Sequence, residues 1–293
     1  MGFGHIPVMV EEVMTFLKCD PGHTYVDATL GGGGHASEIL KRSAPDGTLI
    51  AVEWDEDALF EAKKKLLSFG NRVKLFRENF VHLPDLMTAE SADGILLDLG
   101  LSSIQLEKGE RGFSFKGEGL LDMRMDQRMD ETAADLVNYL SPERLEDILS
   151  DYGQERWAKR IAKAIVQERE REPIGTPEAL RKIVHRAIPR RFHSRRIDPA
   201  TRTFQALRIR VNDELENLER ILKSGWKILK KGGRMCVISF HSLEDRLVKE
   251  TFRALEKQGE ILILTKKPVT PSGEEQKRNP RSRSAKLRCA ERI

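Results

Sequence analysis

Four consecutive glycines, Gly31 to Gly34, constrain this chain more than any other feature of its sequence. They follow an apolar segment, and the whole stretch reads VDATLGGGGHA from Val26 to Ala36. Glycine adopts positive φ without strain and lets another group approach the main chain closely. A glycine-rich turn between a buried strand and a helix is typical of nucleotide-binding α/β folds, so we expect a ligand to lie against this loop.

Short apolar segments alternate with amphipathic ones on both sides of the loop. This alternation predicts a mostly parallel sheet covered by helices on both faces. The last two expected strands are joined by a loop rich in Pro, Ser and Arg, which favours an antiparallel pair at the C-terminal end. The expected strands are residues 24–29, 48–54, 73–77, 94–99, 235–240, 260–265 and 286–293.

The middle of the chain shows no strand pattern. Helices are expected there at residues 132–140, 142–150, 154–171 and 177–187. We therefore predict a discontinuous sheet domain, residues 1–103 and 203–293, with an inserted helical domain at residues 104–202. A further helix is expected at 213–229, ended by a Lys-Lys-Gly-Gly segment at 230–233.

Acidic residues at strand ends indicate the kind of ligand. The spacing Gly31-x-Gly33-x-x-Ala36 fits the dinucleotide fingerprint, and Glu53 ends the second strand, where it can accept the hydroxyls of a ribose. Asp27 would repel a pyrophosphate but could meet the amino group of a methionine moiety. This favours S-adenosylmethionine over NAD. Phe80 either stacks on an adenine or belongs to the core, and Asp98 ends the fourth strand.

Positive charge is clustered along the chain. There are 50 Lys and Arg against 46 Asp and Glu, a net charge of +4. Residues 190–210 hold seven Arg against one acid, and residues 277–292 hold seven basic residues against one acid. Such local excess predicts a polyanion-binding surface, the alternative being a solvated face.

Cysteine, histidine and apolar residues exclude several classes. The three cysteines are far apart and the seven histidines are scattered, so neither a metal site nor a disulfide framework is predicted. No apolar run approaches the ~20 residues that span a bilayer, and the N-terminus lacks the features of a signal peptide. We expect a cytoplasmic protein without a metal or a membrane partner, and the oligomeric state stays open.

Seven segments, in the same order, resemble the MraW family, also called RsmH. Members are S-adenosylmethionine-dependent methyltransferases that act on N4 of a cytidine in 16S ribosomal RNA of the small ribosomal subunit. The resemblance implies a Rossmann-like class I methyltransferase fold, that cofactor and that RNA partner. The segments are HIPVM (5–9), DATLGGGGHA (27–36), DLGLSS (98–103), RGFSF (111–115), LDMRM (121–125), RRIDPATRTFQALRIRVN (195–212) and ISFHSLEDR (238–246).

The resemblance also implies individual cofactor contacts. The residues that match the family's positions are Gly33, Gly34 and His35 in the glycine loop, Glu53 for the ribose, and Phe80, Asp98 and Gln105.

Asp98 is also the leading candidate for a catalytic role. Methyl transfer to a cytosine amine needs alignment of the reactants and a hydrogen-bond acceptor near the weakly nucleophilic nitrogen. Many amino-methyltransferases place a [D/N/S]-P-P-[Y/F/W] motif after the fourth strand, whereas this chain has Asp98-Leu99-Gly100-Leu101. Ser102 and His241 are weaker candidates for the acceptor.

The target base must leave its stack to reach such a site. We expect the basic segments 190–210 and 277–292 to bind phosphates, with Phe192 either stacking on a base or packing locally. Two other functions stay open on the residues alone: an NAD-dependent oxidoreductase, and a non-catalytic RNA-binding assembly factor that keeps the fold of an enzyme.

Overall fold

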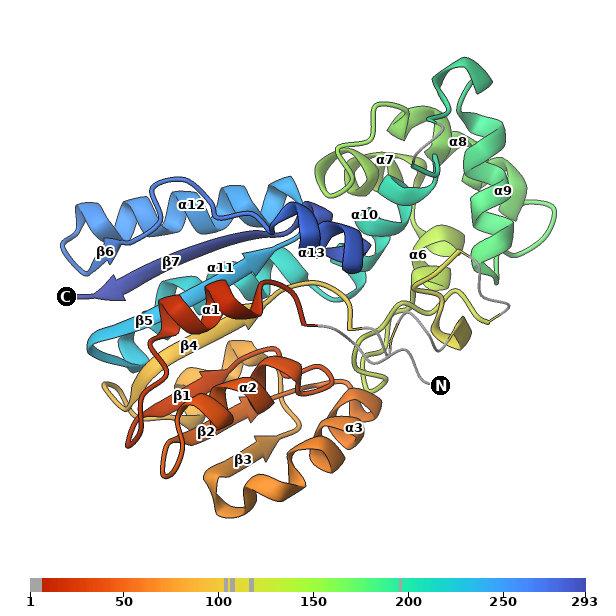
Figure 1. Cartoon of the computed structure of the whole chain (residues 1–293). Coiled ribbons are helices and arrows are strands. Elements are labelled where there is room, and N and C mark those ends of the chain that lie inside the picture. The colour runs from red at the N-terminus through yellow and green to blue at the C-terminus, as the bar shows by residue number, and fades with distance from the viewer. Residues whose placement is uncertain (1–6, 103–104, 106–108, 116–118, 195–196) are drawn as a thin grey trace. The chain divides into compact units, whose positions relative to one another are not determined.

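The chain divides into two compact units. The structure, a computed structural model, describes residues 7–102, 105, 109–115, 119–194 and 197–293. The sheet unit comprises residues 1–104 and 215–293, and the helical unit comprises residues 105–214 (Figure 1). The sequence pattern predicts a return to the sheet domain at 203, but helix α10 (Thr201–Val211) belongs to the helical unit, because it packs against α6 and α7.

A seven-stranded sheet forms the centre of the sheet unit. Its order is β3-β2-β1-β4-β5-β7-β6. The first five strands in this order pair in parallel, whereas β7 pairs antiparallel with both β5 and β6. The predicted α/β class, with a mostly parallel sheet and antiparallel strands at its C-terminal end, is confirmed. The strands are β1 (Thr24–Asp27), β2 (Thr48–Val52), β3 (Val73–Phe76), β4 (Ala92–Asp98), β5 (Leu229–Ser239), β6 (Ile261–Ile263) and β7 (Lys286–Arg292).

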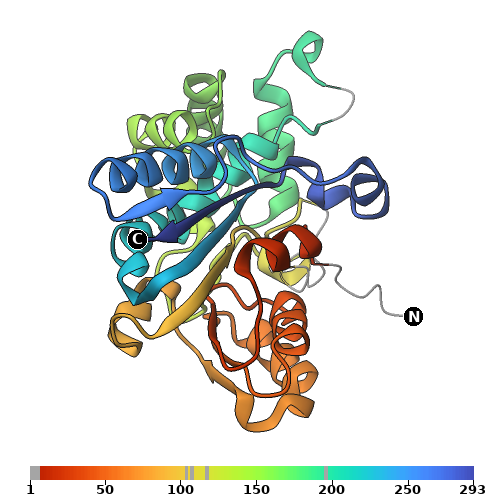
Figure 2. The same ribbon diagram turned by 60° about the vertical axis from the view of Figure 1, so that its left-hand side comes forward.

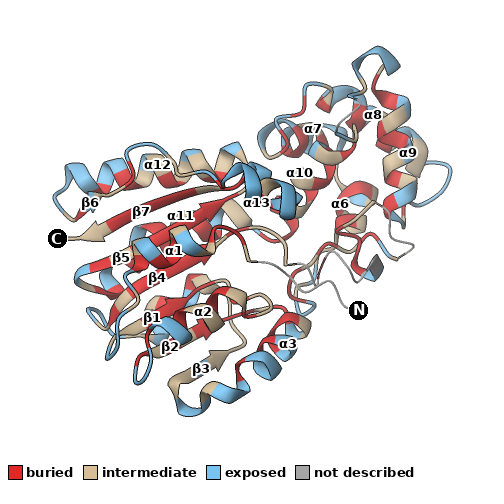
Figure 3. Cartoon of the chain, in the orientation of Figure 1, coloured by how far each residue is buried: buried red, intermediate tan, exposed pale blue. Residues whose placement is uncertain are grey.

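Helices cover both faces of this sheet, as Figure 2 shows from a second direction. Successive side chains of a strand point to opposite faces, so Tyr25 joins a core with α1, α2 and α3, and Val26 joins a core with α4, α11 and α12. The central strands β1, β4 and most of β5 are therefore largely buried, whereas the edge strand β3 is only partly buried, and the helices are exposed on their outer sides (Figure 3). The helices are α1 (Val10–Leu17), α2 (Gly34–Arg42), α3 (Glu56–Leu66), α4 (Leu83–Leu86), α11 (Glu214–Ser224), α12 (Ser242–Lys257) and α13 (Gly273–Arg278).

The helical unit is built from capped amphipathic helices. Ser141 and Thr176 accept hydrogen bonds from the first turns of α7 and α9, and a proline takes the first position of each helix. The buried amide of Asn212 accepts from Met125 N and donates to Met123 O, which ties the LDMRM segment to the end of α10. The helices are α6 (Ala133–Tyr139), α7 (Pro142–Asp151), α8 (Ala158–Arg169), α9 (Pro177–Ala187) and α10.

Two further expectations from the sequence are wrong. The predicted helix to Leu229 ends at Ser224, and the Lys-Lys-Gly-Gly segment lies inside β5. The strand tolerates these residues because its pairing with β4 is irregular there, where Gly232 adopts a φ of +77°. The expected loop at 270–283 contains α13, whose Glu275 accepts a hydrogen bond from Met9 N.

No helix of the described residues is both long enough and apolar enough to span a membrane.

Candidate functional site

The glycine loop joins β1 to α2 and has a left-handed backbone, which glycine adopts without strain, at two of its four glycines. Gly33 precedes the helix with a φ of +73°, and Gly31 has a φ of +50°. A Cβ atom on Gly33 would lie 3.4 Å from Ala62 Cβ, and one on Gly34 would lie 3.1 Å from the Pro7 ring. The loop is therefore held close to its neighbours, and its main chain stays accessible to a ligand at the start of α2.

Glu53 follows the end of β2 and is bound to this loop. Its Oε2 accepts a hydrogen bond from Gly31 N at 2.8 Å, and its Oε1 accepts one from Asp55 N at 2.9 Å. Burial raises the pKa of Glu53 to about 7, and the charges of Asp55 and Asp27 act in the same direction. The carboxyl group is thus fixed in position, while its charge depends on what binds beside it.

Asp27 ends β1 and is buried, with an exposed fraction of 1%. Its Oδ1 accepts a hydrogen bond from Thr29 N at 3.2 Å. Its Oδ2 has no hydrogen-bond partner among the residues that the structure describes. Burial raises the pKa of Asp27 to about 7. A buried carboxylate without a partner is costly, which marks this oxygen as a position for a ligand's donor or cation.

Asp98 ends β4, the strand next to β1. Its backbone N donates to Thr29 Oγ1 at 2.6 Å, and its Oδ2 lies 3.4 Å from His35 Nδ1. Its Oδ1 is buried and has no partner within the described part of the chain. Burial, and then the charges of Asp27 and Glu244, raise the pKa of Asp98 well above its ordinary value.

His35 contacts both Val8 and Asp98 through its imidazole ring. Its Nε2 lies 2.8 Å from Val8 O, and since a carbonyl only accepts, Nε2 carries a hydrogen. Its Nδ1 faces Oδ2 of Asp98 at 3.4 Å, so the ring lies between the Val8 carbonyl and the Asp98 carboxyl group.

Three carboxyl groups thus lie at the carboxyl ends of the neighbouring strands β2, β1 and β4. All three have raised pKa values, and two present unpartnered oxygens. A ligand that brings positive charge and hydrogen-bond donors would relieve the desolvation of these groups. These acceptors fit a ligand that is a cationic nucleoside and also carries an amino group.

Two predicted contacts have different surroundings. Phe80 begins a short 3₁₀ turn after β3 and packs, half-buried, against the core that Val26 joins. Gln105 belongs to the helical unit and is buried, with an exposed fraction of 4%. Neither observation tests its predicted contact with a cofactor, so both stay predictions.

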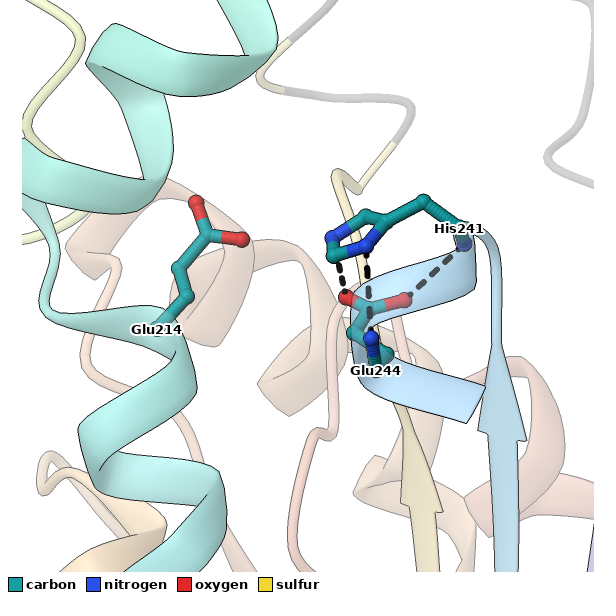
Figure 4. A group of neighbouring side chains, drawn as sticks. All are labelled: Glu214, His241 and Glu244. Atoms are coloured by element: carbon teal, nitrogen blue, oxygen red, sulfur yellow. Dashed lines mark hydrogen bonds and ion pairs between the residues drawn. The ribbon is translucent and has the colours of Figure 1, made fainter. Parts of the chain in front are cut away.

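His241, a weaker candidate for the acceptor, caps a helix. Its Nδ1 accepts from Glu244 N at 3.4 Å, and Glu244 Oε2 accepts from Phe240 N and from His241 N (Figure 4). His241 Nε2 lies 3.1 Å from Glu244 Oε1 without meeting hydrogen-bond geometry. Glu214, also drawn in Figure 4, pairs with Arg208 within the helical unit. These contacts make His241 the capping residue of α12, and this structural role accounts for its position.

The structure divides the arginines of segment 190–210 into two groups. Arg208 pairs with Glu214 at 2.7 Å, Arg210 pairs with Glu131 at 2.9 Å, and Arg202 donates to Gln154 O. Arg190 and Arg191 are exposed and pair with no acid among the described residues. Arg195 and Arg196, also predicted to bind RNA, lie outside the described residues.

The basic C-terminal segment is likewise divided. Lys286 and Arg288 lie in β7 and both pair with Asp245, and Arg292 pairs with Glu90. These three cations therefore stabilise the sheet unit. The remaining basic residues of 277–292 precede β7.

Two sets of residues escaped the sequence analysis. Thr29, which accepts from Asp98 N, could have been found from its position between the end of β1 and the glycines. Arg156 and Trp157 lie beside Phe192, and the basic residues that follow them at helical spacing were the available signal.

Comparison with known proteins identifies the family of this chain. The chain is 50% identical over 292 residues to ribosomal RNA small subunit methyltransferase H of Desulfotalea psychrophila, with 99% of this chain and 98% of that protein covered. It is 50% identical over 311 residues to the protein of the same name from Pelobacter propionicus, with 100% and 99% covered. The solved structure of PH0851 (14% identity, TM-score 0.50, 98% of this chain and 47% of that chain) shares the fold. Residues 2–293 match the MraW methylase family, and the chain belongs to that family.

Proposed function

We propose that this methyltransferase transfers the methyl group of S-adenosylmethionine to N4 of a cytidine in 16S ribosomal RNA. The relatives named as ribosomal RNA small subunit methyltransferases support the RNA class. The observation that carries the cofactor is the group of buried carboxyl groups at the ends of β1, β2 and β4. We place the reaction in the cytoplasm, the compartment of the ribosomal substrate.

The residues of the sheet unit divide the recognition of the cofactor among them. Glu53 accepts the ribose hydroxyls, and the unpartnered Oδ2 of Asp27 accepts the amino group. The main chain at Gly33 and Gly34 meets the methionine part at the start of α2, where backbone N–H groups favour a carboxylate. Phe80 stacks on the adenine, and His35 completes the contacts from this unit. The resemblance to the family also implies a contact from Gln105, a residue of the helical unit.

Asp98 acts on the nucleophile. S-adenosylmethionine, when bound, supplies an electrophilic methyl group. The unpartnered Oδ1 of Asp98 accepts a hydrogen bond from the cytosine amine, which orients its lone pair and draws off a proton as the nitrogen becomes positive. The His35 contact orients the carboxyl group for this task, and the Thr29 hydroxyl, which accepts a hydrogen bond from Asp98 N, holds the main chain of Asp98.

The reaction is tested with purified protein, tritiated S-adenosylmethionine and small ribosomal subunits that lack the modification. We expect label in N4-methylcytidine after digestion of the RNA to nucleosides. Label in another nucleoside would overturn the proposed target atom. Calorimetric binding of the cofactor with no label in any ribosomal RNA would instead favour a non-catalytic assembly factor.

A further inference from the structure

An aromatic pair in the helical unit consists of the exposed Phe192 and the partly exposed Trp157, with two arginines beside them. The Trp157 and Phe192 ring centroids are 5.1 Å apart, with an angle of 49° between the planes. The guanidinium of Arg156 lies 5.6 Å from the Trp157 centroid and 5.5 Å from that of Phe192. Arg191 lies 5.0 Å from the Phe192 centroid. We call these four residues the aromatic platform.

A second aromatic pair in the same unit shows what local packing looks like. Phe115 and Phe204 meet edge to face at 5.5 Å, and Phe204 is buried, with an exposed fraction of 5%. Arg181, which lies over Phe115, is paired with Asp198 at 2.8 Å. Phe192, by contrast, has an exposed fraction of 43%. Packing alone therefore does not account for the platform.

The cations of the platform are available for an anion. Within the described part of the chain, neither Arg156 nor Arg191 pairs with an acid, and both are exposed. Positive charge continues into α8, where Lys159, Arg160 and Lys163 are exposed. Lys163 follows Lys159 by four residues and Arg160 by three, and this spacing places the three on one face of the helix.

We propose that the aromatic platform binds an unpaired nucleotide of the RNA substrate, the base stacking on Phe192 and the phosphates contacting Arg156, Arg191 and the basic face of α8. This deepens the proposed function and rests on it for the identity of the RNA. Aromatic rings amid a basic groove are the usual means of binding single strands, because every base offers a π-face to stack. A base-paired nucleotide keeps its faces covered, so a duplex gains only the phosphate contacts.

The substitution Phe192→Leu tests this directly, because it keeps an apolar side chain and removes the ring. The probe is a short fluorescein-labelled oligoribonucleotide, used as a single strand and in a duplex. We expect the single-strand Kd to rise about tenfold, the order that stacking on one ring supplies. The salt dependence of binding should stay unchanged, since no charge is removed. Binding of the duplex should change less than twofold.

Two further variants serve as controls. Phe60→Leu makes the same change at an exposed ring in the sheet unit, which also has a cation, Lys64, 4.0 Å from its centroid. Its Kd should equal that of the wild type. Phe192→Tyr keeps a ring and should bind the single strand nearly as well as the wild type. Calorimetric binding of the cofactor shows that each variant is folded.

The proposal is overturned if Phe192→Leu and Phe60→Leu bind the single strand equally, or if Phe192→Tyr loses as much as Phe192→Leu. Equal losses for single strand and duplex would also overturn it. Because these titrations need no methyl transfer, they are separate from the proposed function. If binding depends on the ring but the protein methylates no ribosomal RNA, the proposed reaction is refuted and the proposed RNA contact at the aromatic platform is supported.

Discussion

The sheet unit buries carboxyl oxygens that lack a hydrogen-bond partner, and the helical unit exposes arginines that lack an acidic partner. Among the described residues, none hydrogen-bonds to Asp27 Oδ2 or Asp98 Oδ1, and no acid forms an ion pair with the exposed Arg156 or Arg191. Burial raises the pKa of a carboxyl group, so its charge changes with pH near neutrality. Exposure leaves a charge fixed but screened by salt. The two regions should therefore respond to different variables, pH and ionic strength.

The largest effect is expected at the buried acceptor. Asp98→Asn keeps the shape of the side chain but replaces the carboxylate, which can take up the amine proton, with an amide, which cannot. We expect kcat to fall by about 10²- to 10⁴-fold, the range of general-base contributions, measured as label transferred at saturating cofactor. Asp93→Asn, at the opposite end of β4 and beside Lys230, is the control and should retain turnover. Full turnover by Asp98→Asn would refute the acceptor role.

The next effect concerns the ribose. Glu53→Gln would turn an amide N–H₂ toward Gly31 N or Asp55 N, both of which donate to the present carboxylate. We expect the cofactor Kd, measured by calorimetry, to rise about 10- to 100-fold, as for loss of a charged hydrogen-bonding group. Glu56→Gln, at an exposed residue at the start of α3, should bind as the wild type does. Equal Kd values for the two variants would remove Glu53 from the site.

pH should change cofactor binding in the sheet unit. Asp27 and Glu53 have folded pKa values of about 7, above those of the unfolded chain. Without ligand, their contribution to stability is therefore largest below about pH 4 and is lost as pH rises to about 7. A cation binds the ionised forms, so its affinity should rise about tenfold per pH unit up to pH 7 for each proton released. A Kd independent of pH between 5.5 and 8 would contradict this.

The smallest effect is expected at the exposed arginines, where salt is the variable. Arg191→Gln should lower the slope of log K against log salt for single-stranded RNA by about 0.7, the value for one phosphate contact. Arg202→Gln, at an arginine whose guanidinium donates to Gln154 O, should leave the slope unchanged. Titrations at several salt concentrations measure both. Equal slopes for the two variants would place the phosphate contacts elsewhere.

Much of the fold could be predicted because the strands are buried on both faces. All seven expected strands exist. A short apolar run such as Ile95 to Leu97 indicates a buried strand, and these three residues are buried in β4. Helix α10 was missed because its arginines hide the apolar periodicity of Phe204, Leu207 and Val211. The beginning of β5 was missed because two lysines and two glycines normally end a helix, and the irregular pairing that admits them is a property of the sheet.

The site was predictable to a similar extent. The carboxyl ends of parallel strands meet at one edge of a sheet, so the sequence alone predicts that Asp27, Glu53 and Asp98 lie close together. Their hydrogen bonds could not be predicted, because the carboxyl groups of Glu53 and Asp27 accept from main-chain N–H groups, which every residue except proline has. The sequence also shows seven arginines in 190–210 alike, and only the positions of the acids separate those that hold α10 in place from Arg190 and Arg191.

The insertion between β4 and β5 sets an order of events during synthesis. These strands are neighbours in the sheet, yet β4 ends at Asp98 and β5 begins at Leu229. A growing chain therefore holds the complete helical unit before β5, the second partner of β4 besides β1, exists, and local contacts form sooner than distant ones. Until translation reaches β5, β4 is an open edge that can pair with another nascent chain. A chaperone would have most to protect at that stage.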